Sequence, residues 1–330
     1  MVTLWLAISG KEGAILTRPR VVSMMFPVCR GFSCSFFPAL ATAILACALV
    51  GVTGAWAAPA RVLEDHPLAG KIWSSYTNNL TSIDDIVAAA EAADALLLGE
   101  KHDNARHHEL QATLIKRLAV SRPPAAVVWE MIEPGLDPVL AAANSNAEAL
   151  GGTLRWADTG WPPWAEYQPI ADAAIGHRLT MYGAALPRSQ VRALLDGTTS
   201  LKDLGARPLD GDRHDALLDQ LEASHCGAVP RSALSGMASV QTARDAALAQ
   251  KTADAIARGE YPIVITGNGH ARRDRGIPWH LPRRTLLVVA FVEVQRDLEN
   301  PALYLAPGTA DFVWFTPRLD EKDPCERFRR

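Results

Sequence analysis

Short, largely apolar runs alternate with amphipathic segments over most of the chain, and this alternation limits the folds that the chain can adopt. The apolar runs have the length of buried strands and lie at 95–99, 125–131, 179–184, 262–266 and 286–294. Apolar residues recur at helical spacing at 83–93, 107–120, 136–150, 164–176 and 238–258. Apolar strands joined by helices are typical of a parallel sheet that is covered on both faces. We therefore predict an α/β fold with a mainly parallel central sheet flanked by helices.

The region 188–236 interrupts this alternation. Its pattern is polar and helical and it contains several charged residues, so we expect a smaller helical subdomain that could cover the sheet. A chain of 330 residues, of which 48% are hydrophobic, can bury one large core. We expect the α/β domain at 82–300 with this subdomain inside it, a linker at 58–81 and a C-terminal extension at 301–330.

The N-terminal segment 1–57 differs in composition from the rest of the chain. Basic residues precede an apolar stretch at 36–50, and a small-residue Ala-x-Ala site follows that stretch. This order is typical of a secretory signal peptide, so we expect cleavage near Ala57 and an exported protein of the periplasm or outer membrane. Two alternatives stay open: lipidation of Cys47, which follows a loose lipobox, and retention of the apolar stretch as a membrane anchor.

Charge and cysteine content restrict the partners of the chain. The formal net charge is -3 and the sequence contains no long basic run, so nothing indicates nucleic acid as a partner. Cys226 and Cys325 lie outside the N-terminal segment and far from each other in the sequence. An oxidising compartment would permit a disulfide between them, and neither cysteine forms a closely spaced zinc motif.

Ionisable side chains occur where several of the predicted strands end. Glu100 and His102 follow the first strand, Glu130 lies at the end of the second, and His270 follows the fourth. Ligands of open parallel sheets bind beyond the carboxyl ends of the strands, so we expect these four residues to meet in one crevice. Imidazole and carboxylate groups can bind iron, zinc or manganese, and they can also perform general acid–base catalysis.

Other residues near these strand ends have less distinctive patterns. His107 and His108 open the helix after the first strand, and we expect at least one of them to be solvated in the first turn. Arg272 lies in an arginine-rich loop after His270, where it could receive carboxylate or phosphate groups or simply face water. We include His107 and Arg272 among the candidate binding residues.

An aromatic segment lies at 156–167, where three tryptophans and a tyrosine occur close together. The segment could be a packed loop between two helices, because aromatic side chains fill cores well. It could instead form an apolar wall for a flat ligand, with Trp161 in that wall and Tyr167 as an oxygen ligand for ferric iron. The residues alone leave both interpretations open.

Four motifs, in order along the chain, resemble those of ChaN-like iron-regulated haem-binding proteins. They are the Leu-Leu-Gly-Glu-Lys-His-Asp-Asn run at 97–104 followed by two histidines, Gly-Trp-Pro and Tyr-Gln-Pro within 160–169, His-Cys-Gly at 225–227, and Gly-Asn-Gly-His-Ala-Arg-Arg with Gly-Ile-Pro within 267–278. The resemblance extends over roughly 80–294 and places the chain in the wider haem-uptake and Tiki superfamily. Erythromycin esterases and Tiki metalloproteases belong to the same superfamily.

The resemblance implies haem binding for iron acquisition, on an α/β core with a helical subdomain. It also implies that haem could lie between two subunits of a homodimer and that the N-terminus could attach the protein to a membrane. The candidate iron ligands are His102, Tyr167 and His270. The candidate haem contacts are Glu100, His102, His107, Glu130, Trp161, Tyr167, His270 and Arg272.

A metal-dependent or metal-independent hydrolase is the alternative function. Glu100 or Glu130 would act as general base, while His102 and His270 would hold a metal or polarise a carbonyl. The sequence contains neither a Gly-x-Ser-x-Gly elbow nor a His-Glu-x-x-His helix, two motifs that would strengthen this interpretation. We therefore expect a binding protein rather than an enzyme. A purely structural role would not explain why ionisable groups recur at strand ends.

Overall fold

The computed structural model describes residues 62–143 and 146–326. The expected signal peptide at 1–57, with its alternative processing sites at Cys47 and Ala57, lies outside the described residues. Within the described residues, no helix is both long enough and apolar enough to cross a membrane.

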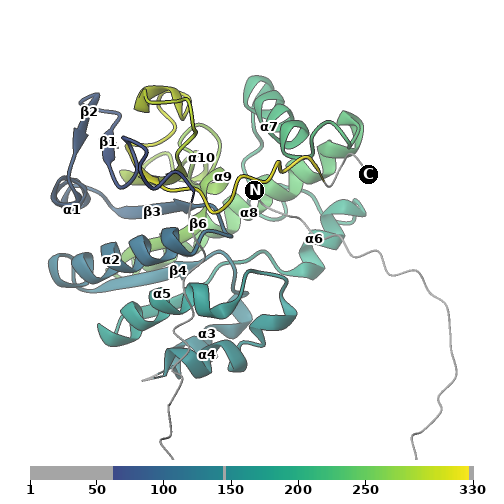
Figure 1. The fold of residues 1–330 in the computed structure, drawn as a ribbon. Coiled ribbons are helices and arrows are strands. Elements are labelled where there is room, and N and C mark those ends of the chain that lie inside the picture. Colours follow the sequence, from purple (N-terminus) through teal and green to yellow (C-terminus); the bar gives the residue numbers. More distant parts are fainter. Residues whose placement is uncertain (1–61, 144–145, 327–330) are drawn as a thin grey trace, which may run out of the picture. The chain divides into compact units, whose positions relative to one another are not determined.

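Eight strands form one sheet in the order β2-β1-β8-β7-β3-β6-β4-β5 (Figure 1). Their bounds are β1 Ile72–Ser74, β2 Asn79–Thr81, β3 Ala95–Glu100, β4 Ala125–Trp129, β5 Thr180–Gly183, β6 Tyr261–Gly267, β7 Leu286–Glu293 and β8 Phe312–Thr316. The strands from β8 to β5 pair in parallel, whereas β1 pairs in antiparallel fashion with both β8 and β2. The predicted α/β fold with a mainly parallel central sheet is therefore confirmed.

Helices connect the parallel strands, as the alternating pattern predicts. Their bounds are α1 Ile83–Glu91, α2 Ala105–Ser121, α3 Asp137–Ala141, α4 Ala147–Thr153, α5 Trp164–Gly176, α6 Arg188–Leu195, α7 Gly211–Ser224, α8 Arg231–Ala257, α9 Asn268–Ala271 and α10 Ile277–His280. The helix predicted at 136–150 is instead divided into α3 and α4. The side chain of Asn146 accepts a hydrogen bond from the Ala149 amide at 2.9 Å, so it caps the start of a second helix.

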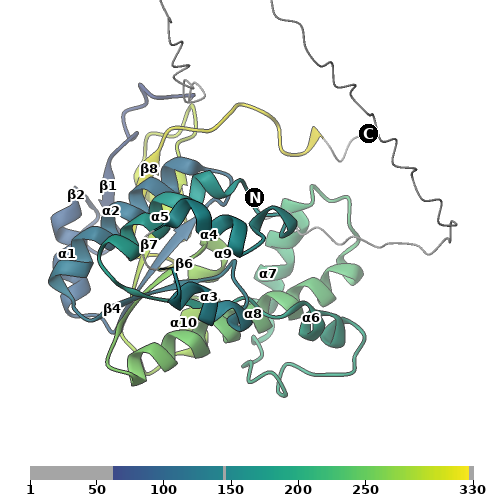
Figure 2. The same ribbon diagram turned by 90° about the horizontal axis from the view of Figure 1, so that it is seen from below.

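Alternate residues of the central strands face opposite layers of helices. In β3, Leu96 and Leu98 pack with α2 and α5, whereas Ala95 and Leu97 pack with α8 and α10. Figures 1 and 2 show helices on both faces of the sheet. Because both faces are covered, β3, β4 and β6 are buried at every position, and a ligand can approach them only at their ends.

The structure differs from two of the expected segment boundaries. The expected linker at 58–81 contains β1 and β2, and the expected extension at 301–330 contains β8. Strand β8 lies inside the sheet, between β1 and β7, so the C-terminal part of the chain belongs to the core. Strands β1 and β2 have only three residues each, too few to show an alternating pattern. Strand β8 is an apolar run, but it lies beyond the motifs that set the expected end of the domain.

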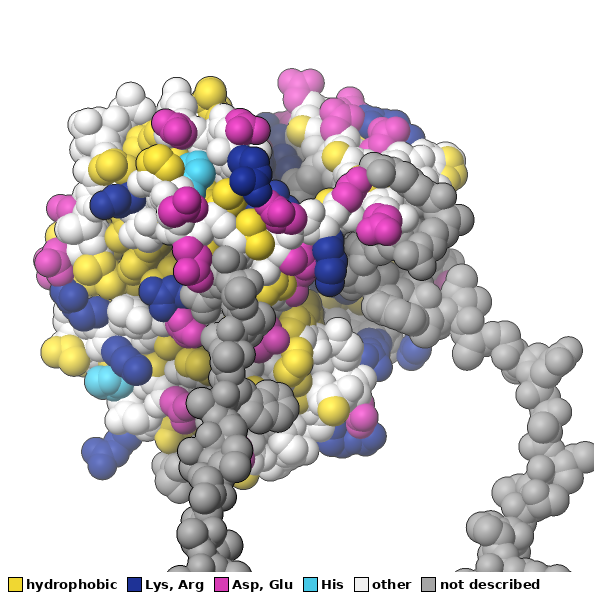
Figure 3. Space-filling model, in the orientation of Figure 1, with side chains coloured by type: hydrophobic (Ala, Val, Ile, Leu, Met, Phe, Trp, Pro, Cys, Tyr) yellow, Lys and Arg dark blue, Asp and Glu magenta, His cyan; other side chains and the backbone are white. Residues whose placement is uncertain are grey.

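Helices α6 and α7, with the first turns of α8, lie in the range 188–236, where a helical subdomain is expected, and we use this name for them. Its own small apolar cluster contains Leu217, Leu218, Leu234 and Ala238. A disulfide joins Cys226, in the turn after α7, to Cys325, and their Cα atoms lie 5.6 Å apart. The bridge fixes the C-terminal segment to the subdomain. On the face drawn in Figure 3, charged side chains of both signs are interspersed.

Candidate functional site

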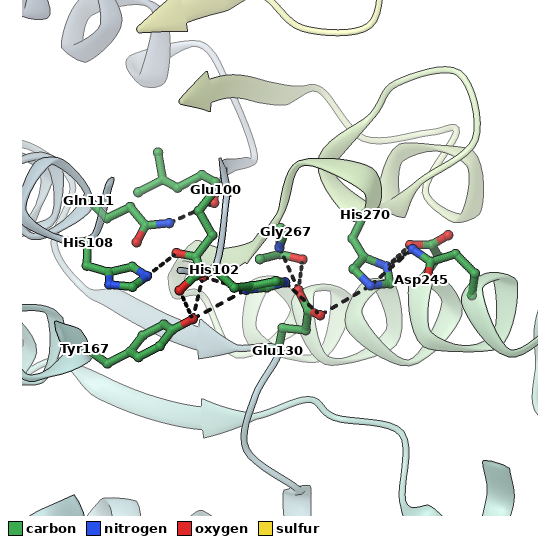
Figure 4. Close-up of polar contacts among 12 residues, drawn as sticks. Glu100, His102, His108, Gln111, Glu130, Tyr167, Asp245, Gly267 and His270 are labelled. Carbon is green, nitrogen blue, oxygen red and sulfur yellow. Dashed lines mark hydrogen bonds and ion pairs between the residues drawn. The ribbon is translucent and has the colours of Figure 1, made fainter. Parts of the chain in front are cut away.

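The carboxyl ends of the parallel strands bring together side chains that are far apart in the sequence (Figure 4). Glu100 is the last residue of β3, Glu130 directly follows β4, and His270 lies in α9 directly after β6. The Oε1 atom of Glu130 lies 3.3 Å from Nε2 of His270 and 3.7 Å from Nε2 of His102. The four residues expected to meet at the strand ends thus form one buried cluster.

Glu130 is a buried carboxylate held through both of its oxygens. Its Oε2 atom accepts hydrogen bonds from the Thr266 hydroxyl and the Gly267 amide, each at 2.7 Å. Burial alone would raise the pKa of Glu130, but the charges of His270 and His102 outweigh burial and hold this pKa well below its ordinary value. The carboxylate is therefore ionised, and its Oε1 atom faces both imidazole rings.

Glu100 is a second buried carboxylate with several partners. Its Oε1 atom accepts hydrogen bonds from Nδ1 of His102 at 2.8 Å and from the Tyr167 hydroxyl at 2.9 Å. Its Oε2 atom lies 3.3 Å from Nε2 of His108. Burial would raise the pKa of Glu100, but attraction to His108 and His102 outweighs burial and lowers it. Because Glu100 is ionised and can only accept, Nδ1 of His102 must carry a proton.

Tyr167 lies on α5 and its side chain is completely buried. Burial and the adjacent charge of Glu100 raise the pKa of Tyr167 well above its ordinary value, so the phenol is neutral. Its ring stacks on His108, with ring centroids 3.9 Å apart, and also packs against Trp156. The aromatic segment is thus a packed loop around Tyr167. Trp161 lies at the cluster, with its ring centroid 4.7 Å from that of His102.

A buried aspartate that the sequence analysis did not single out completes the cluster. The Oδ1 atom of Asp245, on α8, lies 2.5 Å from Nδ1 of His270. Burial would lower the pKa of His270, but the charges of Glu130 and Asp245 outweigh it and raise this pKa to about 10. Burial raises the pKa of Asp245 to about 6, although His270 opposes the shift. At neutral pH, the His270 imidazolium therefore bridges two carboxylates.

The helical pattern of α8 contains a sign of this aspartate. Thr242, Asp245 and Thr252 are all buried on a helix whose other buried positions are apolar. A charged residue at a core-facing helix position is almost never fully buried unless it is paired. The position of Asp245 within the 238–258 helix therefore indicated a partner, although not which partner.

Two candidate binding residues lie apart from the cluster. His107 and His108 are both fully buried, because the start of α2 faces the edge of the sheet, so the expectation of a solvated first turn is wrong. The Nε2 atom of His107 lies 2.9 Å from the Thr316 hydroxyl on β8, and burial lowers the pKa of His107 well below its ordinary value. Arg272 forms an ion pair at 2.7 Å with Asp274 in its own loop.

A cavity of about 470 Å³ opens beside His270, between the carboxyl ends of β3 and β7 and helices α7 and α8. Its apolar lining includes Leu217, Leu221, Met237, Val240, Phe291 and Val292. Its polar lining includes Glu100, Lys101, His225, Gln241, Arg244, His270, Glu293 and Arg318. Apolar walls with a few polar groups are typical of small-molecule sites. We define this space as the subdomain cavity.

The candidate iron ligands differ in their access to the subdomain cavity. His270 lines it, whereas the lining includes neither His102 nor Tyr167. No group of three or more His, Cys, Asp or Glu side chains in the described part of the chain is arranged to hold a metal ion.

Comparison with known proteins identifies one family. The model of the family described as haem-binding uptake, Tiki superfamily, ChaN matches residues 86–281. The matched range contains all members of the buried cluster, from Glu100 to His270. No curated protein matches the chain.

Among solved structures, the chain is similar to ChaN and, at lower TM-scores, to two other proteins. ChaN of Campylobacter jejuni, described with cofacial haem binding, aligns with a TM-score of 0.57 at 22% identity, over 74% of this chain and 95% of that chain. The type III effector HopBA1 aligns with a TM-score of 0.42 at 15% identity, over 71% of this chain and 93% of its own. An erythromycin esterase in its open conformation gives a TM-score of 0.38 at 14% identity, over 78% and 86%. The similarity to ChaN shows that the two proteins share a fold.

Proposed function

The chain belongs to the haem-binding uptake family of the Tiki superfamily represented by ChaN, and from this premise we propose that it is an exported protein that binds haem for iron uptake. The observation that carries the proposal is the subdomain cavity, which combines apolar walls with cationic side chains. Haem is a flat apolar macrocycle with two carboxylates and a central iron. A haem site therefore needs apolar surface, cations for the carboxylates and a ligand for the metal.

The residues of the subdomain cavity fit these three parts. Its volume of about 470 Å³ lies within the roughly 300–1,000 Å³ of small-molecule pockets. Leu221, Met237 and Val292, which are only partly buried, provide apolar surface for a macrocycle. Arg244 and Arg318 provide guanidinium groups, which bind carboxylates well.

We assign His270 as the iron ligand. Bound haem would supply an iron centre that accepts an imidazole nitrogen. Asp245 already orients His270 through Nδ1, as a carboxylate commonly does for a ligating histidine. Ligation through Nε2 requires this atom to release its proton and its 3.3 Å contact with Glu130. Tyr167 is less suited, because its buried hydroxyl donates to Glu100.

A hemin titration of the purified protein tests this proposal. We expect a saturable change in the Soret band and a native mass that increases by whole haems. His270→Ala should alter the Soret position or weaken binding, whereas His177→Ala, which removes an exposed histidine at the end of α5, should not. A titration without saturable spectral change would refute haem binding, and an unchanged spectrum in His270→Ala would refute the assigned ligand.

The buried cluster favours a second candidate, a hydrolase. Two ionised carboxylates, Glu100 and Glu130, lie beside the histidines His102 and His270, and such strongly perturbed groups concentrate at catalytic sites. Glu130 would accept a proton from water while His270 donates one to the leaving group. The low pKa of Glu130 makes it a weak base, which is why we rank this function second. Hydrolysis of activated esters that disappears in Glu130→Gln but survives in His177→Ala would support it.

We propose export on the basis of the N-terminal segment 1–57. The Cys226–Cys325 disulfide supports an oxidising compartment, because structural disulfides rarely persist in the cytosol. A reporter enzyme that is active only after export, fused behind Ala58, tests this proposal. Absence of reporter activity would contradict it. Attachment to the membrane and a homodimer that shares haem stay predictions, testable by fractionation and by native mass.

A further inference from the structure

Arg244 is a half-buried cation without a partner. Among the residues that the structure describes, its guanidinium group makes no hydrogen bond and no ion pair. The other arginine in the lining of the subdomain cavity, Arg318, does have a partner, because its Nε atom donates a hydrogen bond to the Asp320 carbonyl at 3.1 Å. Arg244 is therefore exceptional in its surroundings, and it lines the cavity.

Helix α8 presents Arg244 on a continuous face of the cavity. The cavity-lining residues of α8 are Met237, Val240, Gln241 and Arg244. This spacing of three and four residues places them on one side of the helix. The face is apolar at Met237, near the α7 residue Leu217, and becomes cationic at Arg244, next in sequence to Asp245. The cavity wall thus suits a ligand that is apolar in one part and anionic in another.

The charges near Arg244 leave its donors available. Burial lowers the pKa of Arg244, and the charges of Glu130 and Asp245 offset burial only in part. Both of these carboxylates are engaged by His270. A carboxylate can accept two parallel hydrogen bonds from one guanidinium group, which makes it a well-matched partner. A ligand carboxylate would therefore satisfy a cation that the protein leaves unsatisfied.

We infer that Arg244 binds a carboxylate of the ligand, while the apolar body of the ligand lies against Leu221, Met237 and Val292. The inference depends on the proposed function only for the identity of the ligand. If the ligand is haem, the carboxylate is one of its propionates. The cavity would then recognise the propionate of haem as well as its macrocycle.

Hemin and its dimethyl ester separate the role of the carboxylate from the role of the macrocycle. We expect Arg244→Gln to weaken hemin binding at least roughly tenfold and to leave binding of the ester unchanged. Arg244→Lys should have an intermediate effect on hemin, because it keeps the charge but not the paired donors. Arg258→Gln removes the same charge at the end of α8, where Arg258 pairs with Glu260, and should change neither affinity. Circular dichroism verifies that each variant is folded.

Two results with hemin would overturn the inference: equal affinity in Arg244→Gln and the unaltered protein, or an equal loss for hemin and its ester. If the unaltered protein binds neither compound, the proposed function is wrong. A different probe then tests whether Arg244 binds a carboxylate. Octanoate, a carboxylate with an apolar tail, should then raise the melting temperature of the unaltered protein but not of Arg244→Gln. An octanoate shift that is absent from both proteins, or equal in both, would overturn the inference.

Discussion

Nδ1 of His270 and Oδ1 of Asp245 lie 2.5 Å apart, although 25 residues separate them in the sequence. On the other side of the same ring, Nε2 lies 3.3 Å from Oε1 of Glu130. One imidazolium thus lies between two buried carboxylates. Burial of a charged group is costly unless it is paired, so each member of this triad depends on the others.

Asp245→Asn tests this dependence directly. The substitution removes one of the two negative charges that raise the pKa of His270, while the burial that lowers this pKa remains. We expect the pKa of His270 to fall from about 10 by a unit or more, measured by NMR titration of the imidazole protons. Asp219→Asn, on the exposed side of α7, provides the control. A pKa that does not move would show that Glu130 alone holds the proton on His270.

The same triad predicts how stability depends on pH. The pKa of His270 is about 10 in the folded protein, above its ordinary value of 6.5, so the folded state binds the proton more tightly. The resulting stabilisation is fully present below the ordinary pKa and is lost as pH rises through the folded pKa. The urea midpoint should therefore decrease from about pH 7 to about pH 10, and less steeply in His270→Gln. Equal slopes in the two proteins would contradict this prediction.

Tyr167→Phe distinguishes a structural role from iron ligation. The change removes the hydrogen bond to Glu100, a buried charged acceptor, and should cost about 1.5–3 kcal/mol in the free energy of unfolding. We expect the hemin spectrum to keep its Soret position, because Tyr167 does not line the subdomain cavity. Urea unfolding and a parallel hemin titration measure both effects. A displaced Soret band in this variant would instead return Tyr167 to the candidate iron ligands.

Part of this site could be predicted from the sequence, because residues that follow parallel strands lie at the same edge of the sheet. Glu100, Glu130 and His270 each lie where a parallel strand ends, and parallel strands end at a common edge. Their placement at this edge follows from the order of apolar runs in the sequence, whereas their contact also requires β6 to lie between β3 and β4. Asp245 lies inside a helix, so its contact with His270 depends on how α8 crosses the sheet. No local pattern specifies that crossing.

Other parts of the fold also depend on contacts between distant parts of the chain, which the sequence pattern does not predict. Strand β8 lies inside the sheet only because it pairs with β7 and β1, and these pairings join distant parts of the chain. The subdomain cavity likewise depends on the placement of α7 beside α8. Arg244 can be recognised as unpartnered only after that placement is known.

The Cys226–Cys325 disulfide should contribute substantially to stability. It closes a loop with a sequence separation of 99, and such cross-links restrict the unfolded chain. Replacing both cysteines by serine should lower the free energy of unfolding by about 2–4 kcal/mol. Urea unfolding with and without a reductant measures the effect, and the serine variant, the matched control, should not respond to the reductant. A reductant that leaves the unaltered protein equally stable, although its thiols become titratable, would contradict the prediction.

Gly267 shows how closely the backbone approaches the cluster. A Cβ atom at this position would lie 2.7 Å from Nε2 of His102, closer than side-chain packing permits. The φ angle of Gly267 is -66°, so alanine would fit the backbone and only the clash with His102 would matter. We therefore expect Gly267→Ala to push the ring away from Glu130 and to cost about 1–3 kcal/mol, as overpacking of a core does.

Two further glycines provide reference points for the stability loss expected of Gly267→Ala. A Cβ at Gly176, the last residue of α5, meets no atom within 4 Å, so Gly176→Ala should leave stability unchanged or slightly improved. A Cβ at Gly276 would lie 2.1 Å from the backbone oxygen of His270, and backbone yields less readily than a side chain. Thermal unfolding should rank the variants Gly176→Ala, Gly267→Ala and Gly276→Ala in order of increasing loss. If Gly267→Ala were as stable as Gly176→Ala, His102 could move freely, and the contacts that hold it between Glu100 and Glu130 would be weak.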